Sequence, residues 1–446
     1  MNTYLRYIVL FFSSTFIAPL MAQTATTEFS LDNGLKVIVR EDHRAPVVVS
    51  QLWYKVGSSY EIPGSTGLAH ALEHMMFKGS SKLGPGESSR ILRELGAEEN
   101  AFTSDDYTAY YQVLARDRLA VALEMEADRL AGLTLPEDEF LREIEVIKEE
   151  RRMRTDDRPS SLAYERFKAL AYPASGYHIP TIGWMHDLEH MTIEDLRDWH
   201  TRWYAPNNAT LVIVGDVQPD EVKTLVTRYF AKIPARPLPA TKQPLELDEP
   251  GERSITLYLK TQLPSLMMGF NVPSLASSDK PSEIHALRLI GALLDGGNSS
   301  RIPAQLERKQ ELVAGASAWY NAFSRGDSLF VVSATPNVQK GKTIADVETG
   351  IWQQLKLLQD TPPSAAELAR VRAQVVAAEV YGQDSITSQA TQIGQLESVG
   401  LSWRLQDKDL AALEAVTPAD IQAAAQKFFT RSRLTTAYIH PEEARP

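Results

Sequence analysis

The spacing of apolar residues along the chain changes repeatedly between a period of two and a period of three to four. In residues 27–56, apolar runs and alternation predict β-strands, and Asp32-Asn33-Gly34 supplies a turn between the first two. Amphipathic spacing then predicts helices, and the segments AFTS and YTAYYQVL predict two strands among them. The expected helices cover about residues 66–77, 87–95, 117–131, 137–154 and 192–203, and the apolar strand ATLVIVGDV and a helix ending at Phe230 follow.

A proline-rich segment interrupts this pattern near the middle of the chain. Residues 231–252 contain five prolines and few apolar runs, which is typical of a linker. The segments on either side are each long enough for a domain with strands first and helices after. We therefore expect an α+β protein with an N-terminal domain at residues 23–235, a linker at 236–252 and a C-terminal domain at 253–446.

An internal repeat supports this division. The segment MTIEDLRDWHTRWYAPNNATLVIV at 191–214 aligns without gaps with VTPADIQAAAQKFFTRSRLTTAYI at 416–439, 225 positions later. In each copy a threonine, Thr192 or Thr417, stands where it can cap a helix that leads into a buried strand. The two domains are therefore expected to be duplicates of one another.

Composition narrows the class of protein. The 446 residues, 43% of them hydrophobic and 23% charged, suffice for two or three globular domains. The net charge of -11 disfavours nucleic-acid binding, because such binding relies on positive charge facing the phosphates. The chain has no cysteine, so any metal must be held by histidine and carboxylate side chains.

The first 22 residues have the pattern of a secretory signal peptide. Arg6 is their one charged residue, apolar stretches follow it, and the small residue Ala22 stands at a suitable cleavage point. An uncleaved anchor is the alternative, because the apolar run is nearly long enough to span a membrane. We expect cleavage and a periplasmic or secreted protein with no stable membrane insertion.

The motif His70-Ala71-Leu72-Glu73-His74 carries the strongest chemical signal. On a helix, at ~100° per residue, both histidines and Glu73 fall on one arc of roughly 100°. Two imidazoles one turn apart suit Zn²⁺, and the carboxylate between them can polarise a water molecule at the metal. A lone helical histidine is more often structural, but this triplet is rare by chance in a chain with nine histidines.

A tetrahedral zinc site needs a third protein ligand, and the sequence offers several. The predicted helix LREIEVIKEERRMR carries Glu143, Glu145, Glu149 and Glu150. Glu143 and Glu150 share a face to within ~20°. A solvated face with Glu–Arg pairs is the simpler account of this helix, and spacing alone leaves all four glutamates open.

Three further histidines, His178, His186 and His190, lie close together in sequence. Pro180 and Gly183 stand between the first two, and this loop-to-helix context does not set a common face. We expect these histidines to be structural.

The motif and the acidic helix together resemble the inverzincin group of zinc peptidases, whose HxxEH order inverts the common HExxH. The chain is similar to the pitrilysin/insulinase-type family, specifically its short processing-peptidase-like branch in bacteria and mitochondria, over essentially the whole mature chain. Further matching segments are MFKGS at 76–80, NAFTSDDYTAYY at 100–111 and APNNATLVIVGD at 205–216.

The resemblance implies roles for the site residues. His70, His74 and Glu150 would hold one Zn²⁺ per chain, because Glu150 stands at the family's third ligand position. Glu143 matches a second family glutamate and would support the ligands from behind. Glu73 would be the general base.

The resemblance also implies a fold and a substrate surface. Each half would be an α/β roll, a mixed or antiparallel sheet flanked by helices, and the two rolls together would form one half of a clam-like chamber. An exposed edge strand beside the metal would pair with an extended peptide, although an ordinary sheet strand is the alternative. The residues of this strand are Asn100, Ala101, Phe102 and Thr103.

The second half departs from the motif. HALRL at 285–289 echoes HALEH, but Arg288 and Leu289 replace the glutamate and the second histidine. This copy is therefore expected to bind no zinc and to serve as a wall of the chamber.

The chain is half the length of single-chain relatives that close two jaws around a peptide. An Arg and a Tyr seven residues apart hold substrate on the family's opposite jaw, but Gln374 stands seven positions before Tyr381 here. We therefore expect a heterodimer with a related, zinc-less subunit, with a homodimer or a weakly active monomer as alternatives.

These observations favour a zinc-dependent endopeptidase that acts on unfolded peptides or small protein segments. The alternatives are a non-catalytic binding or assembly subunit of the same fold and a peptide-binding chaperone. The intact set His70, Glu73, His74 and Glu150 favours the enzyme.

Overall fold

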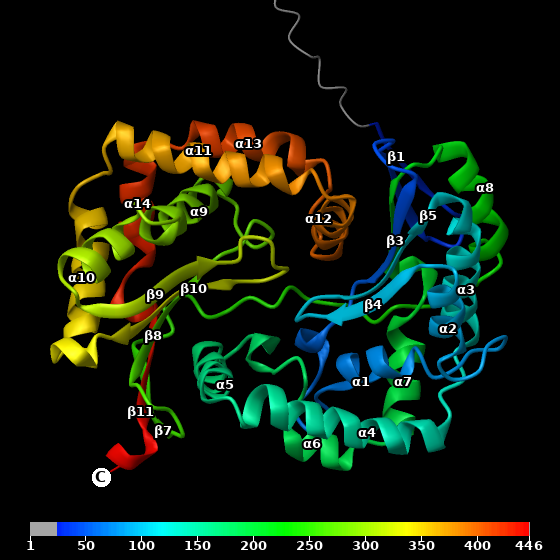
Figure 1. The fold of residues 1–446 in the computed structure, drawn as a ribbon, viewed down its shortest axis with the longest axis horizontal. Helices are drawn as coiled ribbons and strands as arrows, with labels where there is room; N and C mark the ends of the chain where they lie inside the picture. The colour runs from blue at the N-terminus through cyan, green and yellow to red at the C-terminus, as the bar shows by residue number, and fades with distance from the viewer. Residues whose placement is uncertain (1–24, 446) are drawn as a thin grey trace, which may run out of the picture.

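The computed structural model describes residues 25–445, and the expected signal peptide lies outside them. The chain forms two β-sheets, each flanked by helices, and Figure 1 shows them on opposite sides of the molecule. The expected α+β fold of two sheet-and-helix units is confirmed. None of the helices within residues 25–445 combines the length and apolar character needed to span a membrane.

The first sheet has six strands in the order β1-β2-β6-β3-β5-β4. The predicted hairpin is present, because β1 and β2 pair antiparallel around a turn in which Gly34 has a φ of 85°. β6 lies between β2 and β3, parallel to the first and antiparallel to the second. The strands are β1 (Thr26–Ser30), β2 (Lys36–Glu41), β3 (Val47–Tyr54), β4 (Glu98–Thr103), β5 (Thr108–Ala115) and β6 (Ala209–Gly215).

Between residues 25 and 230 the structure has eight α-helices. They are α1 (Leu68–Met75), α2 (Glu87–Glu94), α3 (Leu119–Gly132), α4 (Glu137–Arg151), α5 (Pro159–Ala171), α6 (Met185–His190), α7 (Ile193–Trp203) and α8 (Pro219–Phe230). The helix expected at 137–154 ends its α-helical part at Arg151 and continues as a π-helical turn over Arg152–Asp156. One apolar core joins α1, α3, α4, α7 and α8 to one face of the sheet.

The second sheet has five strands in the order β7-β11-β8-β10-β9. This order repeats the β2-β6-β3-β5-β4 order of the first sheet, including the parallel pairing of the first two strands. The strands are β7 (Arg253–Leu259), β8 (Ser265–Val272), β9 (Val313–Tyr320), β10 (Ser328–Pro336) and β11 (Leu434–Pro441). The helices are α9 (Pro281–Asp295), α10 (Ile344–Asp360), α11 (Ala365–Gly382), α12 (Ile386–Ser398), α13 (Leu405–Ala415) and α14 (Pro418–Phe428).

The internal repeat corresponds to the same unit in both halves. Thr192 and Asp195 form a capping box at the start of α7, and Thr417 and Asp420 form one at the start of α14. Each helix leads into the strand, β6 or β11, that inserts into its sheet. The domain boundaries at residues 235 and 253 stay a prediction.

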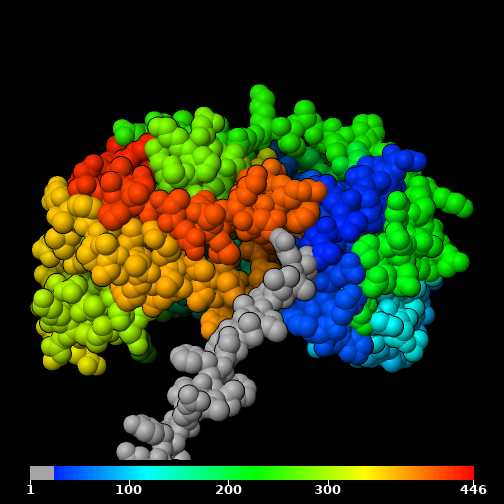
Figure 2. All heavy atoms as spheres, turned by 90° about the horizontal axis from the view of Figure 1, so that it is seen from above, coloured from blue at the N-terminus to red at the C-terminus, as the bar shows by residue number. Residues whose placement is uncertain are grey.

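The two halves exchange one helix each. α5 from the first half packs on the second sheet, where Phe167 is fully buried beside Gly269 of β8. α12 from the second half packs on the other face of the first sheet, where Gly394 lies directly against Trp53 of β3. Figure 2 shows the orange residues near 400 against the blue N-terminal strands. Each half therefore completes the core of the other.

Candidate metal centre

The helix α1, which carries the HALEH motif, is fixed at its first turn. Gly67 precedes it with a φ of 88°, a conformation that glycine adopts without strain. The buried Glu61 carboxylate accepts hydrogen bonds from the amides of Gly67, at 2.7 Å, and Ala69, at 2.8 Å. Leu68 and Leu72 are buried in the core, so the polar residues of the motif face away from it. The orientation of the motif is thus set by packing and by the Glu61 cap.

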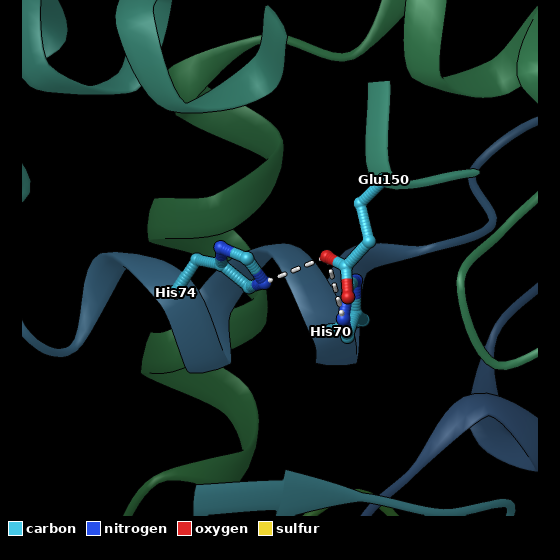
Figure 3. A group of neighbouring side chains, drawn as sticks. All are labelled: His70, His74 and Glu150. Carbon is cyan, nitrogen blue, oxygen red and sulfur yellow. Dashed lines mark ion pairs between the residues drawn. The ribbon is translucent and has the colours of Figure 1, made fainter. Parts of the chain in front are cut away.

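His70, His74 and Glu150 converge from α1 and α4. One ligand atom from each lies within 4.8 Å of the others (Figure 3). The Glu150 Oε2 atom is 3.7 Å from His70 Nε2 and 3.3 Å from His74 Nε2. The prediction that both histidines lie on one helical face is confirmed, and Glu150 is the carboxylate that faces them.

Glu143 contacts the same site from the outside. Its Oε1 atom is 3.0 Å from His74 Nδ1, and its Oε2 atom is 2.5 Å from Lys78 Nζ. This arrangement orients the His74 ring so that Nε2 points at Glu150, as a carboxylate behind a metal-bound histidine does.

The other two glutamates of α4 point away from the site. Glu145 pairs with Lys148 and Glu149 pairs with Arg152, both on the exposed face. The solvated Glu–Arg face that the sequence suggested therefore exists, but it is only one face of α4. The opposite face carries Glu143 and Glu150 to the HALEH motif.

Glu73 lies beside the three converging residues and is oriented by β4. The Thr103 hydroxyl donates a hydrogen bond of 2.5 Å to Glu73 Oε2. Burial raises the pKa of Glu73, while the Thr103 hydrogen bond and the charge of His74 oppose that shift. A carboxylate held in this way can accept a proton near neutral pH more readily than an exposed one.

The pKa values of the two histidines shift in opposite directions. Burial lowers the pKa of His70 to about 3, so this ring is neutral and its Nε2 lone pair is available. Burial also disfavours the charged form of His74, but the Glu143 hydrogen bond and the charge of Glu150 outweigh it and raise the pKa of His74 overall. A proton on His74 would compete with a metal ion for that nitrogen.

The donor set fits zinc. Two imidazole nitrogens and one carboxylate oxygen are the ligands of many catalytic zinc sites, which leave a fourth position open. The Nδ1 atom of His70 is buried and has no hydrogen-bond partner among residues 25–445, so the ring is held by packing on that side.

A cavity of about 630 Å³ opens beside these residues. Its lining includes His70 and Glu73, the β4 residues Ala101, Phe102 and Thr103, and residues of α5 such as Tyr164 and Lys168. β4 is an edge strand and pairs only with β5 among the described strands.

The fourth residue of the expected substrate strand, Asn100, lies next to the cavity lining. Its side-chain Oδ1 accepts a hydrogen bond of 2.8 Å from the backbone amide of Ala101. That amide therefore points away from β5, toward the free edge, and is covered by the Asn100 side chain.

The corresponding helix of the second half, α9, holds an ion-pair cluster instead. Arg288 pairs with Asp409 at 2.6 Å and with Glu379 at 3.0 Å, and His285 is 3.7 Å from Asp409. The Arg288 guanidinium supplies the positive charge that the two carboxylates of this cluster face. Within residues 25–445, no group with metal-ligand geometry occurs in the second half.

The structure gives His186 and His190 the common face that their loop-to-helix sequence context does not set. The loop ends at Trp184, and α6 then places His186, Glu189 and His190 on one exposed face with their ligand atoms within 4.8 Å. The sequence contained the signal, because HDLEH at 186–190 has the same HxxEH spacing as HALEH. His178 lies elsewhere, with its Nδ1 atom 2.7 Å from the Ser175 carbonyl.

Comparison with known proteins places the chain in a family. Residues 36–183 match the family model described as insulinase (peptidase family M16), and residues 190–375 match the peptidase M16 inactive domain. The Helicobacter pylori protein named zinc protease PqqE is 31% identical over 426 residues, which cover 92% of each chain. The chain belongs to peptidase family M16.

Solved structures share the fold of this chain. The crystal structure of a protease from Helicobacter pylori matches with a TM-score of 0.87 at 29% identity, over 94% of this chain and 100% of that one. The first half of the periplasmic protease PqqL from Escherichia coli matches with a TM-score of 0.78 at 19% identity, over 94% of this chain and 92% of that one. This chain spans 48% of the complete PqqL chain.

Proposed function

We propose that this M16 chain is a zinc-dependent endopeptidase that hydrolyses unfolded peptides or small protein segments. The observation that carries the proposal is the convergence of His70, His74 and Glu150 within 4.8 Å, beside a half-buried Glu73 and a cavity. The relatives named zinc proteases support the same assignment.

In this proposal each side chain has one task. His70, His74 and Glu150 would hold one zinc ion, which would supply Lewis acidity when bound. Glu73 accepts the proton of that water and passes it to the leaving amine, in the position that the Thr103 hydroxyl fixes.

Glu143 orients the His74 ring, because its carboxylate contacts Nδ1 and leaves Nε2 for the metal. Lys78 in turn holds Glu143 through its second oxygen. Both residues act on the metal through His74 and do not touch the reacting atoms.

The substrate binds as an extended strand along β4. The free edge of this strand runs along the cavity that contains Glu73, so a peptide paired with Asn100–Thr103 would lie next to the metal. Backbone pairing recognises extended shape more than side-chain identity, so the substrate class is an unfolded segment and not a particular sequence.

The decisive experiment is hydrolysis of a fluorogenic unfolded peptide by the purified chain, with and without a chelator. The proposal expects turnover that is lost in the chelator and restored by added zinc. Turnover that survives complete removal of metal would exclude it. Zinc binding without any hydrolysis would favour a non-catalytic subunit, a role that the inactive-domain match in the second half also allows.

We further propose that the chain works in the periplasm and together with a second two-sheet unit. The chain is similar to the first half of the periplasmic protease PqqL and spans 48% of the complete PqqL chain. This likeness supports both the periplasmic location and the pairing with a second unit. A zinc-less related subunit is the preferred partner, because Gln374 and not an arginine stands seven positions before the exposed Tyr381.

Light scattering combined with the peptidase assay tests the pairing. A monodisperse monomer with full turnover would exclude any second unit. A fully active homodimer would exclude the need for a different subunit.

A further inference from the structure

We propose that His186, Glu189 and His190 form a second site for a divalent transition-metal ion, on the exposed face of α6. One nitrogen or oxygen atom from each of the three side chains lies within 4.8 Å of the others, as at the first site. The proposal does not depend on the peptidase function, because it concerns a different helix and its ligands are not shared with the first site.

The histidine pair of α6 has nearly the geometry of the pair in α1. The ring centroids of His186 and His190 are 4.5 Å apart with an interplanar angle of 50°. Those of His70 and His74 are 4.7 Å apart with an angle of 66°. Both pairs are one helical turn apart, which is the spacing that lets two imidazoles reach one ion.

The protonation of His190 leaves a ligand nitrogen free. Its Nδ1 atom lies 2.8 Å from the backbone carbonyl of His186. A carbonyl only accepts hydrogen bonds, so Nδ1 carries the hydrogen and Nε2 carries the lone pair. This is the arrangement found behind metal-bound histidines, where the second ring nitrogen is held by a backbone or carboxylate oxygen.

The two sites differ in which residue supplies the third ligand. At the first site the carboxylate comes from α4, and Glu73 of the motif stays outside the group. At α6 the motif glutamate itself, Glu189, belongs to the group. All three side chains are exposed, so water molecules would complete the coordination and the ion would exchange more readily than a buried one.

The chemistry of the ligands selects the class of metal. Imidazole nitrogens favour Zn²⁺, Cu²⁺ and Ni²⁺, whereas Mg²⁺ and Ca²⁺ prefer sites built from oxygen alone. A site of two histidines and one carboxylate therefore takes zinc or copper in preference to magnesium or calcium.

An ion on α6 would also act on the start of α1. Asp187, buried on the inner face of α6, accepts hydrogen bonds from the Thr66 amide at 3.1 Å and the Thr66 hydroxyl at 2.6 Å. Thr66 lies just before the motif helix. Because α6 has only six residues and short helices are marginal on their own, an ion that bridges one turn would stabilise both segments.

The test is a zinc titration of the full-length, chelator-treated chain by calorimetry, with thermal unfolding followed in parallel. We expect two classes of zinc site, of which the exposed site on α6 is the weaker. Zinc binding to this weaker class should raise the melting temperature. The His186→Ala/His190→Ala double variant should lose the weaker class, and Glu189→Ala should weaken it at least tenfold. His440→Ala, which removes a histidine from β11, is the matched control and should keep both classes.

A second background separates this proposal from the proposed function. In the His70→Ala/His74→Ala variant only the weaker class should remain, whether or not the chain is a peptidase. The proposal is overturned if the unchanged chain binds a single ion, or if the weaker class persists in the His186→Ala/His190→Ala variant.

Discussion

At the residue scale, the two glutamates that share a face of α4 have different positions relative to the histidines. Glu150 faces both Nε2 atoms, whereas Glu143 holds the back of the His74 ring. Glu150→Ala should therefore lose the zinc ion of the HALEH site, and Glu143→Ala should weaken zinc binding there by about 10–100-fold. Zinc per chain after dialysis measures both effects, and Glu149→Ala on the exposed face should match the unchanged chain. Full zinc occupancy in Glu150→Ala would mean that another residue is the third ligand.

Glu61 gives the fold a pH dependence. Burial raises its pKa to about 8, although two amide hydrogen bonds act in the opposite direction. Because the folded pKa lies above the unfolded value of 4.5, the folded state binds the proton more tightly, and stability falls as pH rises from about 5 to 8.

Glu61→Gln should flatten the pH dependence of stability. Urea unfolding in chelator at several values between pH 5 and 8 measures it, with the exposed Glu145→Gln as the control. An unchanged slope in Glu61→Gln would assign the pH dependence to other groups.

The residues of the HALEH motif could be predicted from the sequence because helical geometry alone sets their common face. The choice of Glu150 from four glutamates needed the family resemblance. The Thr103–Glu73 and Glu143–His74 contacts join residues 30 and 69 positions apart, so no local pattern indicates them. The proline and glycine before the second HxxEH segment favour a loop, so the local pattern does not indicate the common face that α6 provides.

At the element scale, β4 is the surface on which the proposed peptide would pair. The Ala101 amide points to the free edge, where Asn100 Oδ1 covers it. Ala101→Pro removes this donor and should raise KM or abolish turnover while zinc stays bound. Ala101→Ser keeps the amide and is the matched control. Normal cleavage by a folded, zinc-loaded Ala101→Pro chain would place the substrate elsewhere.

Most helices and strands could be predicted because their apolar spacing is regular and their caps are local. The capping box at Thr192 and Asp195 is an example, since all of its hydrogen bonds lie within four residues. The position of β6 between β2 and β3 could not be predicted in this way. Its pairing joins segments more than 150 residues apart in the sequence, and depends on how the whole half packs.

At the scale of the whole molecule, the exchanged helices α5 and α12 make the two halves depend on each other. Phe167 is fully buried in the core between α5 and the second sheet, so Phe167→Ala should lower the free energy of unfolding by about 3–5 kcal/mol. Because the core is shared, the variant should still unfold in a single transition. Tryptophan fluorescence measures this transition. Leu357→Ala, at an exposed position, should have little effect. Two separate transitions in Phe167→Ala would show that the halves are independent.

The central claim is that Glu73 is the base of a zinc peptidase and not a ligand, and one paired measurement on Glu73→Gln tests it. The amide cannot accept a proton, but it has nearly the same shape and leaves both imidazoles and Glu150 in place. We predict one zinc ion at the HALEH site, as in the unchanged chain, and peptide hydrolysis reduced by about 10²–10⁴-fold or more. Zinc lost together with activity, or hydrolysis retained with zinc bound, would contradict the account.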